Sequence, residues 1–108
     1  MIAPARVAAY EVLCAVNGGR ADLPHALANA RQALDDERDR ALGGEIATGT
    51  LRWQGAFDHV IALFGRRSLT RFDPEVLNIL RLTMFQLLHL DRVPAAAAVN
   101  DSPRRSIN

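Results

Sequence analysis

The chain has 108 residues, of which 49% are hydrophobic and 23% charged, with 13 basic and 12 acidic side chains. This length allows one small hydrophobic core and excludes a cofactor-dependent enzyme fold of about 250 residues, while the composition excludes wholesale disorder. The net charge of +1 excludes a histone-like coating of nucleic acid, so a local patch would have to bind any RNA or DNA.

The cysteine content and the hydropathy pattern indicate a cellular location. Cys14 is the single cysteine, which excludes an internal disulfide and is typical of a reducing compartment. The first ten residues do not have the pattern of a signal peptide, and no apolar run approaches the length of a membrane span. We therefore expect a cytoplasmic protein with no membrane partner.

Apolar spacing and end signals predict the first two helices. Apolar residues recur every three or four positions over residues 5–16, and Gly18-Gly19 then ends the helix because glycine readily takes the left-handed cap conformation. Asp22 is the predicted N-cap of a second helix, whose apolar stripe covers residues 23–34.

Asp35 or Asp36 is the predicted N-cap of a third, much longer helical segment. Gly55 lies within its apolar stripe, so we expect a bend or break near Gln54-Gly55. Trp53 belongs to the stripe, which assigns it to the core rather than to base stacking. The stripe consists of Leu42, Ile46, Gly49, Trp53, Phe57, Val60, Ile61 and Phe64. Close packing against neighbouring helices is expected at Gly43, Gly44 and Gly49.

Asp73-Pro74-Glu75 has the strongest helix-start signal in the chain. The run 76–90 that follows is apolar almost all round, which predicts a central helix buried on every side. Within it, Arg81 is expected to be paired or to extend its charge to the surface. A last helix beginning near Ala95 is interrupted at Pro103. The prediction is an all-α bundle around a buried central helix, with an incomplete final helix.

The residue types that usually carry catalysis are not arranged for it. Cys14 lies within a helix among apolar residues and is expected to pack there. His25, His59 and His89 fall on three different helices without paired-ligand spacing. The carboxylates of residues 35–39 alternate with arginines, as in a solvated helix start. We expect no catalytic residue, no metal and no cofactor.

Exposed arginines are the candidate binding residues. Arg66, Arg67 and Arg71 fall in the connector before Asp73, where all three can point outward, and Arg6 and Arg20 lie near the two ends of the first helix. Two interpretations stay open at this point. The arginines keep the domain soluble, or they form a face that contacts the phosphates of RNA.

A set of short motifs extends over nearly the whole chain, from about Ala5 to Ser102. They are DERDR (36–40), GTLRW (49–53), DPEV (73–76), LRL (80–82), QLL (86–88), DRVP (91–94) and AVND (98–101). Together they resemble the NusB-like domain. The GTLRW motif favours the version found at the N-terminus of the RsmB (Sun/Fmu) type of ribosomal RNA cytosine-5 methyltransferase over the free antitermination factor.

The resemblance implies an all-helical RNA-binding domain over residues 1–102, an irregular tail over 103–108 and ribosomal RNA as the partner. In such methyltransferases a separate S-adenosylmethionine-binding domain with catalytic cysteines transfers the methyl group, and Cys14 matches no catalytic position. We therefore expect this chain to have no enzymatic activity. The first alternative is a stand-alone antitermination factor that acts with a ribosomal protein. The second is a homodimer formed through the groove that an incomplete final helix leaves open.

Overall fold

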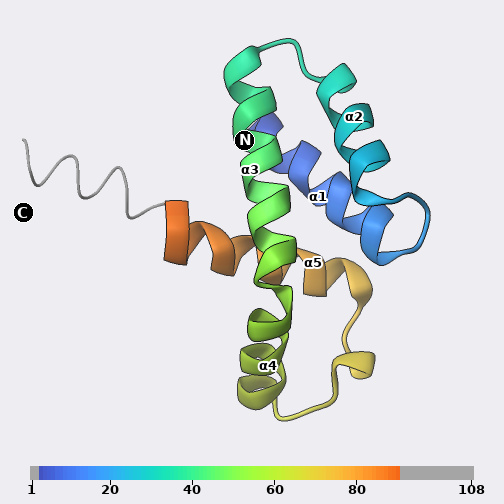
Figure 1. Ribbon diagram of the computed structural model, residues 1–108. Helices are drawn as coiled ribbons and strands as arrows, with labels where there is room; N and C mark the ends of the chain where they lie inside the picture. The colour runs from blue at the N-terminus through green and yellow to red at the C-terminus, as the bar shows by residue number, and fades with distance from the viewer. Residues whose placement is uncertain (1–2, 91–108) are drawn as a thin grey trace, which may run out of the picture.

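The computed structural model describes residues 3–90, which form helices and no strand (Figure 1). The predicted all-α class is thereby confirmed. None of the helices between residues 3 and 90 combines the length and hydrophobicity needed to cross a membrane. The expected final helix with its interruption at Pro103, and the tail 103–108, lie outside the described residues. The elements are α1 (Pro4–Asn17), α2 (Leu23–Ala33), α3 (Glu37–Arg52), α4 (Gln54–Gly65), η1 (Leu69–Arg71), α5 (Pro74–Phe85) and η2 (Gln86–Leu90).

The helix ends follow the predicted capping chemistry. Asp22, Asp36 and Asp73 each accept a backbone N–H two or three positions further on, at 2.9, 2.7 and 2.8 Å. The backbone N–H and then the ring of His25 hold the pKa of Asp22 below its ordinary value. Gly19, just after α1, has a φ of 75°, which glycine adopts without steric cost. These local contacts fix where α1, α2, α3 and α5 meet their loops.

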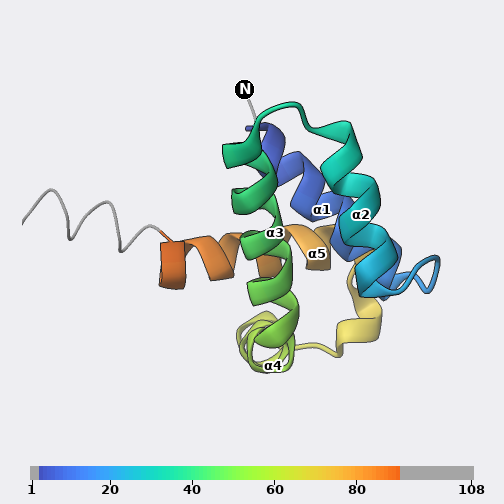
Figure 2. The ribbon, with the colours of Figure 1, turned by 45° about the horizontal axis from the view of Figure 1, so that its top comes forward.

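The hydrophobic core forms where α1, α3 and α5 meet. α1 contacts α2, α3 and α5, and α5 crosses the junction of α3 and α4 (Figure 2). Gly43 on α3 allows α1 to come close, since a Cβ on Gly43 would lie 3.2 Å from the carbonyl oxygen of Ala5. The core comprises Ala9, Val12, Leu13, Ala26, Ile46, Ala47, Phe57, Leu82 and Phe85.

α5 occupies the central position that the sequence predicts, with contacts to α1, α3 and α4. The expectation that it is buried on every side is wrong for the part of the chain that the structure describes. Leu77 and Leu82 are buried on one face, whereas Ile79 is 51% exposed and Leu87 in the following η2 is 61% exposed. Apolar residues on all sides of a helix allow any face to be buried. They do not show which neighbouring elements cover each face.

The long helical segment breaks at Trp53, which confirms the predicted break and places it one residue earlier. Trp53 has φ −98° and ψ 8°, so α3 and α4 follow one another with a bend between them (Figures 1 and 2). Because of the break, the apolar residues before and after Trp53 no longer lie on one continuous helix face. As a result Trp53 is 47% exposed and Phe64 79% exposed, and the assignment of Trp53 to the core is wrong.

Gly49 provides room for an aromatic ring of the core. A Cβ at this position would lie 2.3 Å from both Cε1 and Cζ of Phe85. At Gly44, by contrast, no such neighbour lies within 4 Å. The expectation of close packing is therefore confirmed for Gly43 and Gly49 and wrong for Gly44.

Gly49→Ala is expected to lower the free energy of unfolding by about 1–3 kcal/mol, because Phe85 has to leave its place in the core. Gly44→Ala is the matched control on the same helix. With no clash, it should raise the free energy of unfolding by up to about 1 kcal/mol through better helix propensity. Urea denaturation followed by circular dichroism measures both changes. Equal stability of the two variants would contradict the packing that we describe at Gly49.

Candidate nucleic-acid interface

The connector between α4 and α5 carries a concentration of positive charge. Residues 66–72 include three arginines and no acidic residue. The side chains of Arg66, Arg67 and Arg71 are all exposed. The structure therefore places these three predicted residues on one short surface segment, which we call the arginine connector (residues 66–72).

Local contacts define the path of the arginine connector. Arg66 ends α4 in the left-handed conformation, with φ 57° and ψ 35°, the one non-glycine residue with positive φ among residues 3–90. The guanidinium carbon of Arg67 lies 4.4 Å from the centre of the Phe72 ring. Phe72 packs so closely on Gly65 that a Cβ there would lie 2.7 Å from its Cζ. Ser68 caps η1 by accepting the backbone N–H of Thr70 at 3.3 Å.

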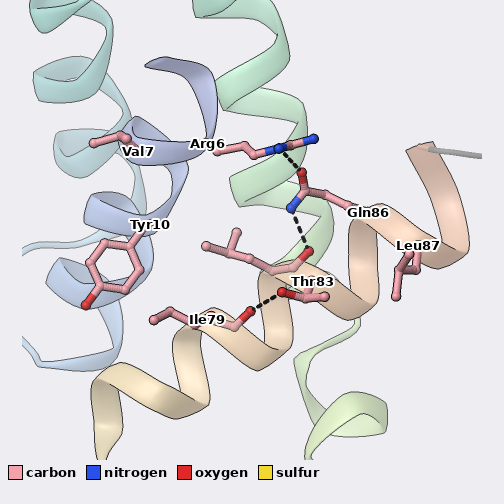
Figure 3. Close-up of a pocket in the computed structure, with 8 residues that line it drawn as sticks. Arg6, Val7, Tyr10, Ile79, Thr83, Gln86 and Leu87 are labelled. Carbon is pink, nitrogen blue, oxygen red and sulfur yellow. Dashed lines mark hydrogen bonds between the residues drawn. The ribbon is translucent and has the colours of Figure 1, made fainter. Parts of the chain in front are cut away.

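The two remaining predicted arginines lie near opposite ends of α1, about 20 Å apart for a helix of this length. Arg20 lines a cavity of about 790 Å³ together with Asp73 and Glu75, so it lies beside the start of α5 that follows the arginine connector. Arg6 instead donates a hydrogen bond to the Oε1 atom of Gln86, beyond the other end of α5 (Figure 3). The five arginines therefore do not form one cluster.

A largely apolar groove lies next to Arg6. The groove has a volume of about 640 Å³ and lies between α1 and α5, with Arg6 and Gln86 at its edge (Figure 3). We call it the α1–α5 groove. Its lining residues are Arg6, Val7, Tyr10, Ile79, Leu82, Thr83, Gln86 and Leu87.

A buried polar network fixes α4 and α1 against α5. Arg81 is only 8% exposed and donates two hydrogen bonds to the carboxylate of Asp58, at 2.7 and 2.9 Å. The side-chain oxygen of Asn78 accepts hydrogen bonds from Arg81 and from Asn17, both at 2.9 Å. The prediction that Arg81 is paired is confirmed. Asn17 and Asn78 were not predicted from the sequence, although Asn78 is the single asparagine in the apolar run 76–90 and that was a usable signal.

The cysteine and histidines do not assemble into a reactive centre. Cys14 is half-buried, accepts a hydrogen bond from Asn78 at 3.5 Å, and raises the pKa of Tyr10 to about 12 through a side-chain hydrogen bond. In the part of the chain from residue 3 to residue 90, no three His, Cys, Asp or Glu side chains come together as a metal site requires. The surface features that stand out are thus the arginine connector and the α1–α5 groove.

These features place the protein in the class of small all-helical domains. Its first helix is rich in alanine, and polar side-chain contacts join α1 and α4 to α5. The NusB family model matches residues 3–104 of the sequence, and the chain belongs to this family. The family named by the resemblance of its motifs is thereby confirmed.

Curated relatives fall into two groups. The chain is 36% identical over 97 residues to ribosomal RNA small subunit methyltransferase B of Pseudomonas putida, covering 90% of this chain and 22% of that protein. It is 43% identical over 101 residues to a putative methyltransferase of Mycobacterium tuberculosis, covering 90% and 21%. Transcription antitermination protein NusB of Coxiella burnetii is 27% identical over 66 residues, covering 61% and 48%. No solved structure matches the chain.

The fraction of each protein that the alignment covers differs between the two groups of relatives. The chain spans about a fifth of the length of the methyltransferases it matches, and it corresponds to their N-terminal part. The antitermination protein is the more distant relative, both in identity and in the share of this chain that aligns. The main interpretation of the motifs, a NusB domain of the methyltransferase type, is therefore favoured over the free factor.

Proposed function

We propose that this chain is an RNA-binding domain that serves as the N-terminal module of a ribosomal RNA methyltransferase. One observation carries the proposal. Similarity to the Pseudomonas methyltransferase extends over 90% of the chain, whereas similarity to the Coxiella antitermination protein extends over 61%. Methyl transfer itself we assign to the part of such proteins that this chain does not match, so the role of these residues is to engage the RNA.

In this proposal the arginine connector contacts RNA phosphates. Arg66, Arg67 and Arg71 are exposed within seven residues that contain no carboxylate, which is the charge pattern that a polyanion requires. Arg20 extends this face toward the start of α5, where Asp73 and Glu75 reduce the local positive charge. Arg6 forms a separate second edge beyond the far end of α5. The domain needs neither a metal nor a cofactor for this role.

Salt dependence of RNA binding tests the proposed function. The purified chain is titrated with a small-subunit ribosomal RNA fragment and with an unrelated RNA of equal length, at several salt concentrations. The three arginines of the arginine connector, each neutralising one phosphate of single-stranded RNA, should contribute about −2 to the log–log slope of affinity against salt, and contacts of Arg6 and Arg20 make the total slope steeper. Preferential binding of the ribosomal fragment supports the methyltransferase module. An affinity that does not change with salt concentration, or the absence of binding to either RNA, would overturn the proposal.

Two other expected partners stay predictions. A ribosomal protein would be required if the chain acted as a stand-alone antitermination factor, and a pull-down without such a partner counts against that alternative. A homodimer would use the α1–α5 groove, where Val7 and Ile79 are 41% and 51% exposed. Light scattering that shows a strict monomer across a concentration series would remove the homodimer.

A further inference from the structure

Trp53 is a large aromatic side chain that the fold leaves on the surface. It lies at the break between α3 and α4, and 47% of it is exposed. It is also the single tryptophan of the chain. Tryptophan offers a large apolar face, so its exposure at a helix junction favours a binding role over a packing role.

The ring of Trp53 is supported from the core outward by two other rings. Phe85 is buried at 5% exposure, and the ring of His89 stacks on it with centroids 4.7 Å apart and an interplanar angle of 16°. Trp53 stacks on His89 in turn, with centroids 5.7 Å apart and an angle of 30°. This series of rings anchors Trp53 to the core, so little side-chain entropy is left to lose when a further ring binds.

The residues that adjoin Trp53 in the sequence carry positive and no negative charge. Arg52 directly precedes it, is exposed, and has no ion-pair partner among residues 3–90. From residue 46 to residue 57 the sequence contains no acidic side chain. An exposed aromatic ring with an exposed arginine next to it in the sequence matches a nucleotide, because the base can stack while the adjoining phosphate meets the cation.

We propose that Trp53 stacks on an unpaired base of the bound RNA, and that Arg52 contacts the adjoining phosphate. This inference rests on the proposed function, since it concerns the same RNA. It adds a stacking contact at the α3–α4 junction to the phosphate contacts of the arginine connector. Stacking on tryptophan tolerates any base, so this contact strengthens binding to single-stranded segments without reading their sequence.

Fluorescence of the single tryptophan tests the stacking directly. A single-stranded ribosomal RNA fragment is added to the chain, and binding is followed both by the anisotropy of labelled RNA and by the emission of Trp53. We expect the emission to be quenched along the same curve as the anisotropy. Anisotropy that rises while the emission stays unchanged would overturn the stacking and leave RNA binding intact. Absence of both signals would instead overturn the proposed function and, with it, this inference.

Matched variants separate stacking from stability. Trp53→Ala should weaken RNA binding about 5- to 100-fold, whereas Trp53→Phe, which keeps a stacking ring, should stay within about threefold of the wild type. Leu63→Ala is the control, because Leu63 is an apolar side chain of α4 that is 64% exposed and belongs to none of the proposed binding surfaces, so RNA affinity should stay almost unchanged. Thermal unfolding confirms that each variant is folded. Equal affinities of Trp53→Ala and Leu63→Ala would contradict the proposal and point to a protein partner for this surface.

Discussion

Asp58→Ala is expected to lower the free energy of unfolding by about 3–5 kcal/mol. The substitution leaves Arg81 buried at 8% exposure without the carboxylate that accepts its two hydrogen bonds. The cost of an uncompensated charge away from water exceeds the contribution that the pair makes when intact. Denaturation in urea measures this change. The dependence of the free energy of unfolding on urea concentration should match that of the wild type.

Two control variants identify the cause of this loss. Glu45→Ala removes an exposed carboxylate on α3 and should change the free energy of unfolding by less than about 0.5 kcal/mol. The double variant Asp58→Leu with Arg81→Met removes both charges and should recover part of the stability that Asp58→Ala loses, because no buried ion remains unpaired. If Asp58→Ala were as stable as Glu45→Ala, the buried network would not hold α4 to α5 as described.

Replacing Arg66, Arg67 and Arg71 together with alanine is expected to weaken RNA binding by about tenfold or more at moderate salt, whatever the RNA sequence. The same variant should flatten the log–log salt slope by about 2, because three phosphate contacts are lost. Stability should change little, since all three side chains are exposed. Anisotropy titrations at several salt concentrations give both the affinity and the slope.

The control for this variant removes charge elsewhere on the surface. Arg31→Ala with Arg38→Ala takes two exposed arginines from α2 and α3, where acidic residues such as Glu37 are close by. This pair should leave the salt slope almost unchanged. Equal losses of affinity in both variants would show that overall charge attracts the RNA and that the arginine connector makes no specific contact.

The sequence predicted the helix boundaries well where the signal is local. An aspartate that caps a helix bonds to its own chain two or three residues away, so Asp22, Asp36 and Asp73 could be assigned without a tertiary structure. The assignment of Trp53 to the core was wrong because it assumed one helical phase for the apolar residues between 42 and 64. The backbone dihedral angles of Trp53 interrupt the helix and change the direction in which the later side chains point. These angles cannot be read from the residue type.

The candidate site was predictable to a smaller extent. Exposure of Arg66, Arg67 and Arg71 followed from their place in a connector, which is a local property. The positions of Arg6 and Arg20 depend on what faces each end of α1, namely Gln86 at one end and the start of α5 at the other. The ring series behind Trp53 joins residues more than thirty positions apart, so only the packed structure brings it together.

α4 and the arginine connector are attached to the rest of the domain by few buried residues. α4 buries Phe57 and Ile61, and η1 buries none of its residues. Segments with so little buried apolar surface open locally at a lower free energy than the rest of the fold and exchange their amide hydrogens faster. The proposed phosphate contacts thus lie on a segment that opens more readily than the core formed by α1, α3 and α5. Bound RNA would slow the exchange of this segment first, and part of the binding free energy would be spent in holding it closed.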